Sequence, residues 1–231
     1  MYTYFSNQIL ENRINMSKKD TSPLYELLGY DAFLTIFNEA ITESGNGSAS
    51  AAIALVDIDW FGKFNNTNGT QSGDELIHTL GRCLSDTIGD VGSVFRYGGD
   101  AFMILFPDME KEQAFLNTER TRIQFEKIET IRIGTKDLTI DATISCGIAA
   151  FPDDSAKSAE VIRKCSEALY RAKVSGRNKV ALSREEKMVT KTTHYTQGQL
   201  EGLSRLAKRE SMNEAALLRE ALDDVLRKHN S

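Results

Sequence analysis

Two glycines and an aspartate separate two apolar segments in the stretch FRYGGDAFMILF, residues 95–106. Paired glycines between β-forming segments are typical of a tight hairpin turn, because glycine readily adopts the positive φ angles that such turns need. The sequence therefore predicts two adjacent strands joined at Gly98 and Gly99. Asp100 lies in this turn as either a turn residue or a metal ligand, and a GGD triplet alone favours the turn residue.

A second apolar run, AAIALVDID at residues 51–59, is short and continuous, which predicts a buried strand ending at Asp57. Residues 139–151 alternate like a strand. Because strands and helices interleave, we expect an α/β (α+β) domain with helices packed on a central sheet. Apolar residues recur at helical intervals in four segments, at 23–41, 73–88, 112–128 and 158–178, the last stopping near Gly176.

The composition is that of an ordinary soluble globular protein, with 41% hydrophobic and 26% charged residues among 231. The net charge is −5, but residues 187–231 carry +2, which leaves −7 for the rest. No apolar run approaches the about 18 residues of a membrane span, and no signal-peptide core appears. Cys83, Cys146 and Cys165 form neither a zinc motif nor a disulfide framework. We therefore expect a cytoplasmic protein with no membrane partner.

The two acidic positions are suited to a metal site. Magnesium sites usually need only one or two carboxylates together with substrate phosphates. Two metal ions between Asp57 and Asp100 would activate a hydroxyl group and stabilise a leaving pyrophosphate. Gly98 and Gly99 would allow a triphosphate to approach the backbone closely. The alternative, that Asp100 only shapes the turn, stays open at this point.

Further motifs surround the turn at ordered spacing. RYGGDAF (96–102), DIDWFGKFNNTNGTQSGDELI (57–77), TISCGIA (143–149) and EALYRAKVSGRNKV (167–180) resemble the motifs of the GGDEF family. This family comprises the diguanylate cyclases, which join two GTP molecules into cyclic di-GMP. The resemblance covers about residues 23–182 and implies a nucleotidyl-cyclase palm-like domain whose central sheet is mainly antiparallel and flanked by helices.

The resemblance also implies roles for individual residues. Asp57 and Asp100 would be catalytic and, with the Ile58 carbonyl, would hold Mg²⁺ or Mn²⁺. Asn65 and Asp74 match a guanine-reading pair, because a carboxylate accepts hydrogen bonds that guanine donates and adenine does not. Cationic side chains near the end of the last helix would hold the triphosphate. The implied GTP-binding residues are Phe61, Lys63, Asn65, Asp74, Gly98, Gly99, Lys173 and Arg177.

Several positions depart from the family pattern, which makes the GGDAF signature degenerate. Ala101 replaces the second acid of the signature, and Gly62 stands where a phosphate-facing lysine is usual. The product-inhibition motif RxxD is replaced by GDVG at residues 89–92, so we expect no feedback through that site. The remaining substitutions are Tyr30, Asp31, Asn66, Thr70 and Ser166.

The C-terminal segment resembles a ribbon-helix-helix module, a β-α-α unit that dimerises and places paired strands in the DNA major groove. Thr196 and Asn213 are suited to cap two amphipathic helices, each with leucines on one face. By alternation Thr190, Thr192 and His194 would face bases, and the helix N-terminus at Asn213 could hold a DNA phosphate. The alternative is a helical hairpin docked on the first domain.

The expected organisation is an N-terminal leader over 1–22 with no sensor domain, a GGDEF domain over 23–183, a linker over 184–189 and the ribbon-helix-helix module over 190–231. Two functions stay open. One is a diguanylate cyclase that binds GTP and Mg²⁺ and is paired into a homodimer by its tail. The other is a catalytically inactive sensor of guanine nucleotide or cyclic di-GMP on a DNA-binding transcription regulator. Ala101 favours the sensor, and the retained acids and cations favour the cyclase.

Overall fold

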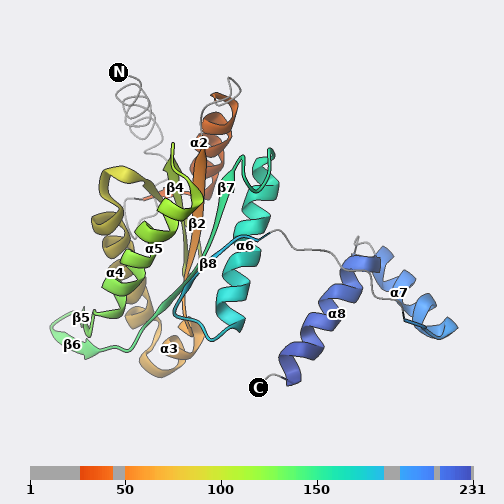
Figure 1. Cartoon of the computed structure of the whole chain (residues 1–231). Helices are drawn as coiled ribbons and strands as arrows, with labels where there is room; N and C mark the ends of the chain where they lie inside the picture. The colour runs from red at the N-terminus through yellow and green to blue at the C-terminus, as the bar shows by residue number, and fades with distance from the viewer. Residues whose placement is uncertain (1–26, 44–49, 185–192, 211–213, 230–231) are drawn as a thin grey trace. The chain divides into compact units, whose positions relative to one another are not determined.

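The computed structural model describes residues 27–43, 50–184, 193–210 and 214–229 (Figure 1). The chain divides into two compact units, Met1–Glu185 and Glu186–Ser231. The first unit contains the region that resembles a GGDEF domain, and the second contains the tail. The predicted leader, residues 1–22, lies outside the described residues, as does all of the predicted linker except residue 184.

A six-stranded sheet forms the centre of the first unit (Figure 1). Its strands are β1 (Leu28–Gly29), β2 (Ala51–Ile58), β3 (Ser93–Gly98), β4 (Ala101–Pro107), β7 (Ile144–Phe151) and β8 (Val180–Leu182). Their order is β1-β3-β4-β2-β7-β8, in which the four inner strands pair antiparallel and each edge strand runs parallel to its neighbour. The mainly antiparallel sheet expected from the sequence is confirmed, and so is the β3–β4 hairpin with its turn at Gly98 and Gly99.

Helices cover both faces of the sheet. They are α2 (Tyr30–Glu43), α3 (Phe61–Asn68), α4 (Thr70–Ile88), η3 (Gly89–Val91), α5 (Lys111–Glu126) and α6 (Ser158–Val174). Helices α4 and α5 pack on one face, and α2 and α6 pack on the other (Figure 1). A separate hairpin of β5 (Thr130–Ile133) and β6 (Lys136–Thr139) follows α5. Within the described ranges, no helix is both long and apolar enough to cross a membrane.

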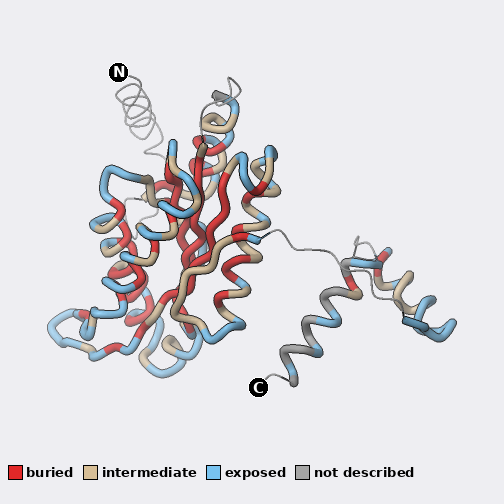
Figure 2. The backbone as a smooth tube through the Cα atoms, viewed as in Figure 1, coloured by how far each residue is buried: buried red, intermediate tan, exposed pale blue. Residues whose placement is uncertain are grey.

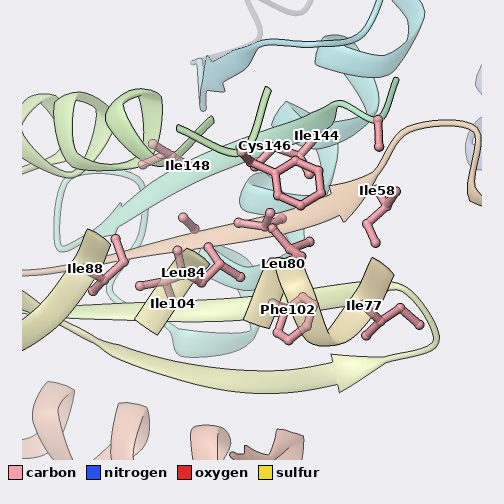
Figure 3. Close-up of a cluster of buried hydrophobic side chains, with 14 of the residues drawn as sticks. Ile58, Ile77, Leu80, Leu84, Ile88, Phe102, Ile104, Ile144, Cys146 and Ile148 are labelled. Carbon is pink, nitrogen blue, oxygen red and sulfur yellow. The ribbon is translucent and has the colours of Figure 1, made fainter. Parts of the chain in front are cut away.

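The alternation of side chains along the strands builds a core on each face of the sheet. In β2, Ala52, Ala54 and Val56 belong to one cluster with Leu80 and Leu84 of α4. Figure 3 shows part of this cluster, with Ile58, Leu80 and Leu84 labelled. The intervening side chains of β2 face α2 and α6. There, Ile53 and Leu55 form a second cluster with Phe33, Phe37 and Cys165. Strands β2, β4 and β7 are consequently buried on both faces, as Figure 2 shows. This explains why β2 appears in the sequence as a continuous apolar run.

Helix α6 packs closely against the sheet at Gly147 of β7. A Cβ atom added at Gly147 would collide with the backbone of Cys165 and Leu169 in this helix. The glycine in the TISCGIA motif is therefore required by helix–sheet packing. This close packing fixes the position of α6, whose last turn carries Lys173.

Three expectations about elements were wrong or incomplete. The helix expected over 23–41 begins only at Tyr30, because Leu28 instead pairs with Phe95 at the sheet edge. The strand expected over 139–151 begins at Ile144, since Thr139 belongs to the β5–β6 hairpin. Helix α3 was not predicted, because its sequence FGKFNNTN has no apolar periodicity and no buried residue.

The second unit contains two helices, α7 (Gln197–Glu210) and α8 (Glu214–His229), as the sequence predicted. Thr196 caps α7 as expected: its hydroxyl accepts a hydrogen bond from the Gln199 amide, and its own amide donates to Gln199 Oε1. Ala207 and Leu217 are buried, but three large apolar side chains that the amphipathic pattern places inside are exposed, because two short helices cannot cover all their apolar side chains. These are Leu200 (45%), Leu222 (57%) and Val225 (54%).

Candidate functional site

Two acidic residues meet at the carboxyl end of β2. Asp57 is the last residue but one of this strand and pairs with Ala101, the first residue of β4. Asp100 precedes Ala101 in the turn, and its backbone carbonyl accepts a hydrogen bond from the Ile58 amide at 3.4 Å. The sheet register therefore brings together Asp57, Ile58 and Asp100, the three residues expected to hold the metal.

The Asp57 side chain is only 15% exposed, and its Oδ1 lies 2.6 Å from the Lys173 ammonium nitrogen of α6. Burial raises the pKa of Asp57, Lys173 opposes this rise, and the nearby Asp100 and Asp59 carboxylates add to it. The ionised form of Asp57 consequently gains from a close positive charge. Lys173, which was expected to hold triphosphate oxygens, supplies that charge in this structure.

The turn that carries Asp100 is held by an arginine of the same motif. Gly98 and Gly99 have φ angles of 145° and 53°, which few other residues adopt. The Arg96 guanidinium donates to the Ala101 carbonyl at 3.0 Å and to the Gly99 carbonyl. It also lies over the Phe102 ring, 4.8 Å from the centroid. The arginine of RYGGDAF therefore stabilises the turn.

The expected guanine-reading residues come from two helices that pack closely. Asn65 lies on α3, and its Oδ1 atom is buried without a hydrogen-bond partner. A Cβ atom at Gly73 of α4 would collide with this Oδ1, so the glycine makes room for the Asn65 amide. Asp74 follows Gly73 and is exposed. An unpaired buried acceptor beside an exposed carboxylate is suited to a ligand that donates hydrogen bonds.

The other two expected residues of α3 differ in their surroundings. Phe61 is half-buried and packs against the core on the α4 and α5 side of the sheet. Lys63 is exposed, as is Gly62, which stands at the position where the family usually has lysine. Of the two, Phe61 has a role in packing, and Lys63 is accessible to a ligand in solution.

Asp59 is a residue of the site that the sequence analysis missed. It is only 5% exposed and accepts hydrogen bonds from Thr143 Oγ1 at 2.8 Å and Ser145 Oγ at 2.7 Å. It also accepts one from the Asn178 amide at 2.9 Å. The DID and TISCGIA motifs thus contact each other and the loop after α6. The small hydroxyl residues at alternate positions of TISCGIA were the available signal.

The loop after α6 is tied to α5 as well. Asn178 accepts a hydrogen bond from Arg122 at 2.5 Å and donates one to Glu126 at 2.7 Å. Arg122 is also paired with Glu119 and Glu126, and these hydrogen bonds raise its pKa even though burial lowers it. This network fixes the backbone beside Arg177, whose guanidinium lies over the Trp60 ring, 3.6 Å from the centroid.

The residues at the end of β2 fit a hard divalent cation. Carboxylate and carbonyl oxygens are the ligands that Mg²⁺ and Mn²⁺ prefer, and Asp57 already holds a positive group. Within the described residues no group of three or more His, Cys, Asp or Glu side chains could hold a metal ion. Substrate phosphates would therefore have to complete the coordination.

The residues expected to contact DNA are only partly described. His194 is exposed and lies in a segment, residues 193–196, without strand pairing in the single chain. Thr190, Thr192 and Asn213 lie outside the described residues. A ribbon forms only between two chains, so the DNA contacts stay a prediction.

Comparison with known proteins supports the assignment made from the motifs. Residues 23–179 match the family described as diguanylate cyclase, GGDEF domain. Diguanylate cyclase A of Treponema denticola is 26% identical over 197 residues, which cover 79% of this chain and 52% of that protein. Diguanylate cyclase DosC of Escherichia coli K12 is 31% identical over 162 residues, which cover 69% of this chain and 34% of that protein. The chain thus spans about half of the one relative and about a third of the other.

A solved structure shows the same fold. The GGDEF domain of DgcB from Caulobacter crescentus, in complex with c-di-GMP, is similar with a TM-score of 0.65 at 30% identity. The match covers 71% of this chain and 95% of that one. Together with the motif geometry at the end of β2, these matches show that the chain belongs to the GGDEF family and carries a diguanylate-cyclase-like domain.

Proposed function

We propose that the first unit binds GTP with Mg²⁺ or Mn²⁺ and condenses two GTP molecules slowly into cyclic di-GMP. The observation that carries this proposal is the partly buried Asp57 carboxylate at the end of β2, with Asp100 beside it and Lys173 as its counter-ion. The cytoplasmic location expected from the sequence is part of the same proposal.

Different residues of the site would bind the metal, the triphosphate and the guanine base. Asp57, Asp100 and the Ile58 carbonyl would hold the metal, which supplies Lewis-acid activation of the attacking hydroxyl and charge neutralisation of the phosphates. Lys173 would then be released from Asp57 to contact triphosphate oxygens as a point charge, and Arg177 would bind them with its planar fork. Asn65 and Asp74 would accept hydrogen bonds from guanine. Gly98 and Gly99 would leave space beside the backbone for phosphate.

Ala101 is the reason to expect slow turnover. It lies directly opposite Asp57 in the sheet, so an acid at this position would add a third carboxylate to the site. Ala101 is instead only 8% exposed and packs with the core on the α2 and α6 side. The same observation favours the second candidate function, in which the domain binds guanine nucleotide or cyclic di-GMP without turnover and regulates a DNA-binding tail.

Chromatography of the products after incubation with GTP and each divalent metal tests the first function. We expect slow formation of cyclic di-GMP that Asp100→Asn reduces at least about a hundredfold, because one of only two ligating carboxylates is lost. Absence of product with every metal, together with retained GTP binding, would favour the sensor instead. Absence of product, of GTP binding and of cyclic di-GMP binding would exclude both functions of the site.

The second unit is proposed to pair two chains as a ribbon-helix-helix module and, through it, to bind DNA. Support comes from the exposed apolar side chains Leu200, Leu222 and Val225, which a single chain of this unit leaves in solvent. Removing residues 187–231 should convert a dimer into a monomer in light scattering and abolish any DNA mobility shift, since the rest of the chain carries −7. A full-length monomer that ignores duplex DNA would support the docked hairpin.

A further inference from the structure

Trp60 is an exposed aromatic residue directly after the DID motif. Its side chain is 61% exposed, and it occupies the N-cap position of α3 without making a capping hydrogen bond. Its φ angle is 59°, a conformation that bulky residues rarely adopt. Burial and capping therefore do not explain why this position holds a tryptophan.

The indole ring instead faces a cation from the other side of the site. The Arg177 Cζ atom lies 3.6 Å from the centroid of the Trp60 ring. Arg177 also has a positive φ angle, 61°. Such backbone conformations persist where the surroundings determine them, and they occur often at ligand-binding sites. Here they direct two side chains from distant parts of the sequence onto each other.

The backbone on both sides of the contact is fixed by hydrogen bonds. The Arg177 amide donates to the Ala172 carbonyl at 3.0 Å, and the Asn178 amide donates to Asp59 Oδ2 at 2.9 Å. Asp59 immediately precedes Trp60. Across the described part of the chain, Arg177 forms no ion pair with a carboxylate. The Trp60 ring is thus what orients its guanidinium.

We propose that Trp60 is a positioning residue that holds Arg177 ready for the phosphates of a nucleoside triphosphate. A guanidinium that stacks through its planar face keeps its N–H donors free at the edge, where they suit phosphate oxygens. Holding the side chain in advance also reduces the conformational entropy lost on binding. This inference rests on the proposed binding of GTP and adds a residue that the family motif does not specify.

Calorimetry with GTP–Mg²⁺ and with guanosine tests the inference in the full chain. We expect Trp60→Ala to weaken GTP binding about three- to tenfold and leave guanosine binding unchanged, because only phosphate contacts depend on Arg177. Trp60→Phe, which keeps an aromatic face, should stay within about twofold of the wild type. In an Arg177→Ala background, Trp60→Ala should have no further effect, as expected for two residues that act as a unit.

Fluorescence gives a second readout that needs no activity. Trp60 is the only tryptophan in the chain, so emission excited selectively over the seven tyrosines reports on the surroundings of this side chain. Arg177→Ala should change the emission without nucleotide, and GTP should change it in the wild type but not in Arg177→Ala.

Two results would overturn the inference while leaving the proposed function intact. In one, the wild type binds GTP and Trp60→Ala binds it equally well. In the other, the losses from Trp60→Ala and Arg177→Ala are fully additive. A wild type with no affinity for GTP would instead remove the proposed function, and the inference with it.

Discussion

Two aspartates with little solvent exposure, at the ends of neighbouring strands, have opposite surroundings. Asp154, just beyond β7, accepts hydrogen bonds from the Ala150 amide at 2.7 Å and Ser183 Oγ at 2.6 Å, and pairs with Lys111 at 3.1 Å. Burial would raise the pKa of Asp154, but these hydrogen bonds lower it overall. Asp57, at the end of β2, has a raised pKa and pairs with Lys173.

The comparison separates a structural carboxylate from one that can bind a ligand. The oxygens of Asp154 are occupied by groups of the protein, so the ion is stabilised in the fold itself. The charge of Asp57 is only partly compensated, and a lysine can leave when a stronger cation arrives. A carboxylate whose raised pKa arises from burial in a functional cleft is a candidate for chemistry, and here the neighbouring Asp100 supports that interpretation.

Replacing Asp154 should give the largest loss of stability. Asp154→Ala removes the acceptor for Ala150 and Ser183 and leaves Lys111 without its partner, so we expect the free energy of unfolding to fall by about 3 kcal/mol. Urea denaturation measures this change. Asp153→Ala, at the exposed neighbouring residue, is the matched control and should stay within about 0.5 kcal/mol of the wild type. Equal effects of the two variants would contradict the structural role of Asp154.

Replacing Asp59 should cause an intermediate loss of stability. This residue accepts structural hydrogen bonds and also lies next to the candidate site. Asp59→Asn keeps the shape but loses the charge that accepts from Thr143, Ser145 and the Asn178 amide, so stability should fall by about 1–2 kcal/mol. GTP affinity in calorimetry should also fall, because the loop that carries Arg177 is released. The exposed Asp137→Asn serves as control. Unchanged stability and unchanged affinity would show that Asp59 does not support this loop.

The two aspartates should contribute to the pH dependence of stability with opposite signs. These changes in the free energy of unfolding should be the smallest of those expected here. The lowered pKa of Asp154 stabilises the fold above the ordinary value of 3.8, and this contribution is lost as pH falls through the folded-state pKa. The raised pKa of Asp57 destabilises the fold at neutral pH, and this cost disappears as pH falls through its folded-state pKa, above 3.8.

Denaturation of Asp57→Asn and Asp154→Asn between pH 7 and about pH 3 measures both effects. Asp57→Asn should be slightly more stable than the wild type at pH 7, by less than about 1 kcal/mol, and lose this advantage first on acidification. Asp154→Asn should be less stable, and its deficit should persist to lower pH. If the stability difference of Asp154→Asn disappeared at a higher pH than that of Asp57→Asn, the environments assigned to the two aspartates would be refuted.

Much of the fold was predictable because its signals are local. The continuous apolar run at 51–58, the glycine pair at Gly98 and Gly99 and the periodic helices each depend on neighbouring residues. The two-residue strand β1 was missed because Leu28 gains its partner, Phe95, from a distant segment. Helix α3 was missed because it buries no apolar face.

The site was predictable in part for the same reason. Motif spacing led to Asp57 and Asp100, whereas the bonds of Asp59 join residues more than 80 positions apart and have no periodic signal. The stacking of Arg177 on Trp60 depends on backbone conformations at both residues that no pattern of residue types specifies. The hydrogen bonds from Arg96 to the turn carbonyls, which stabilise the turn, were likewise not predictable from the sequence.

Equilibrium dialysis of Mn²⁺ in the presence of GTP tests most directly whether Asp57 is the carboxylate that binds the metal, because Mn–GTP distributes over both sides and only protein-bound Mn²⁺ accumulates on the protein side. The wild type and the exposed-site control Asp153→Asn should both show this excess of Mn²⁺ at saturating GTP. Asp57→Asn should reduce Mn²⁺ affinity at least about tenfold, because it removes one of the two ligating carboxylates. Equal Mn²⁺ binding by Asp57→Asn and the wild type would contradict the account.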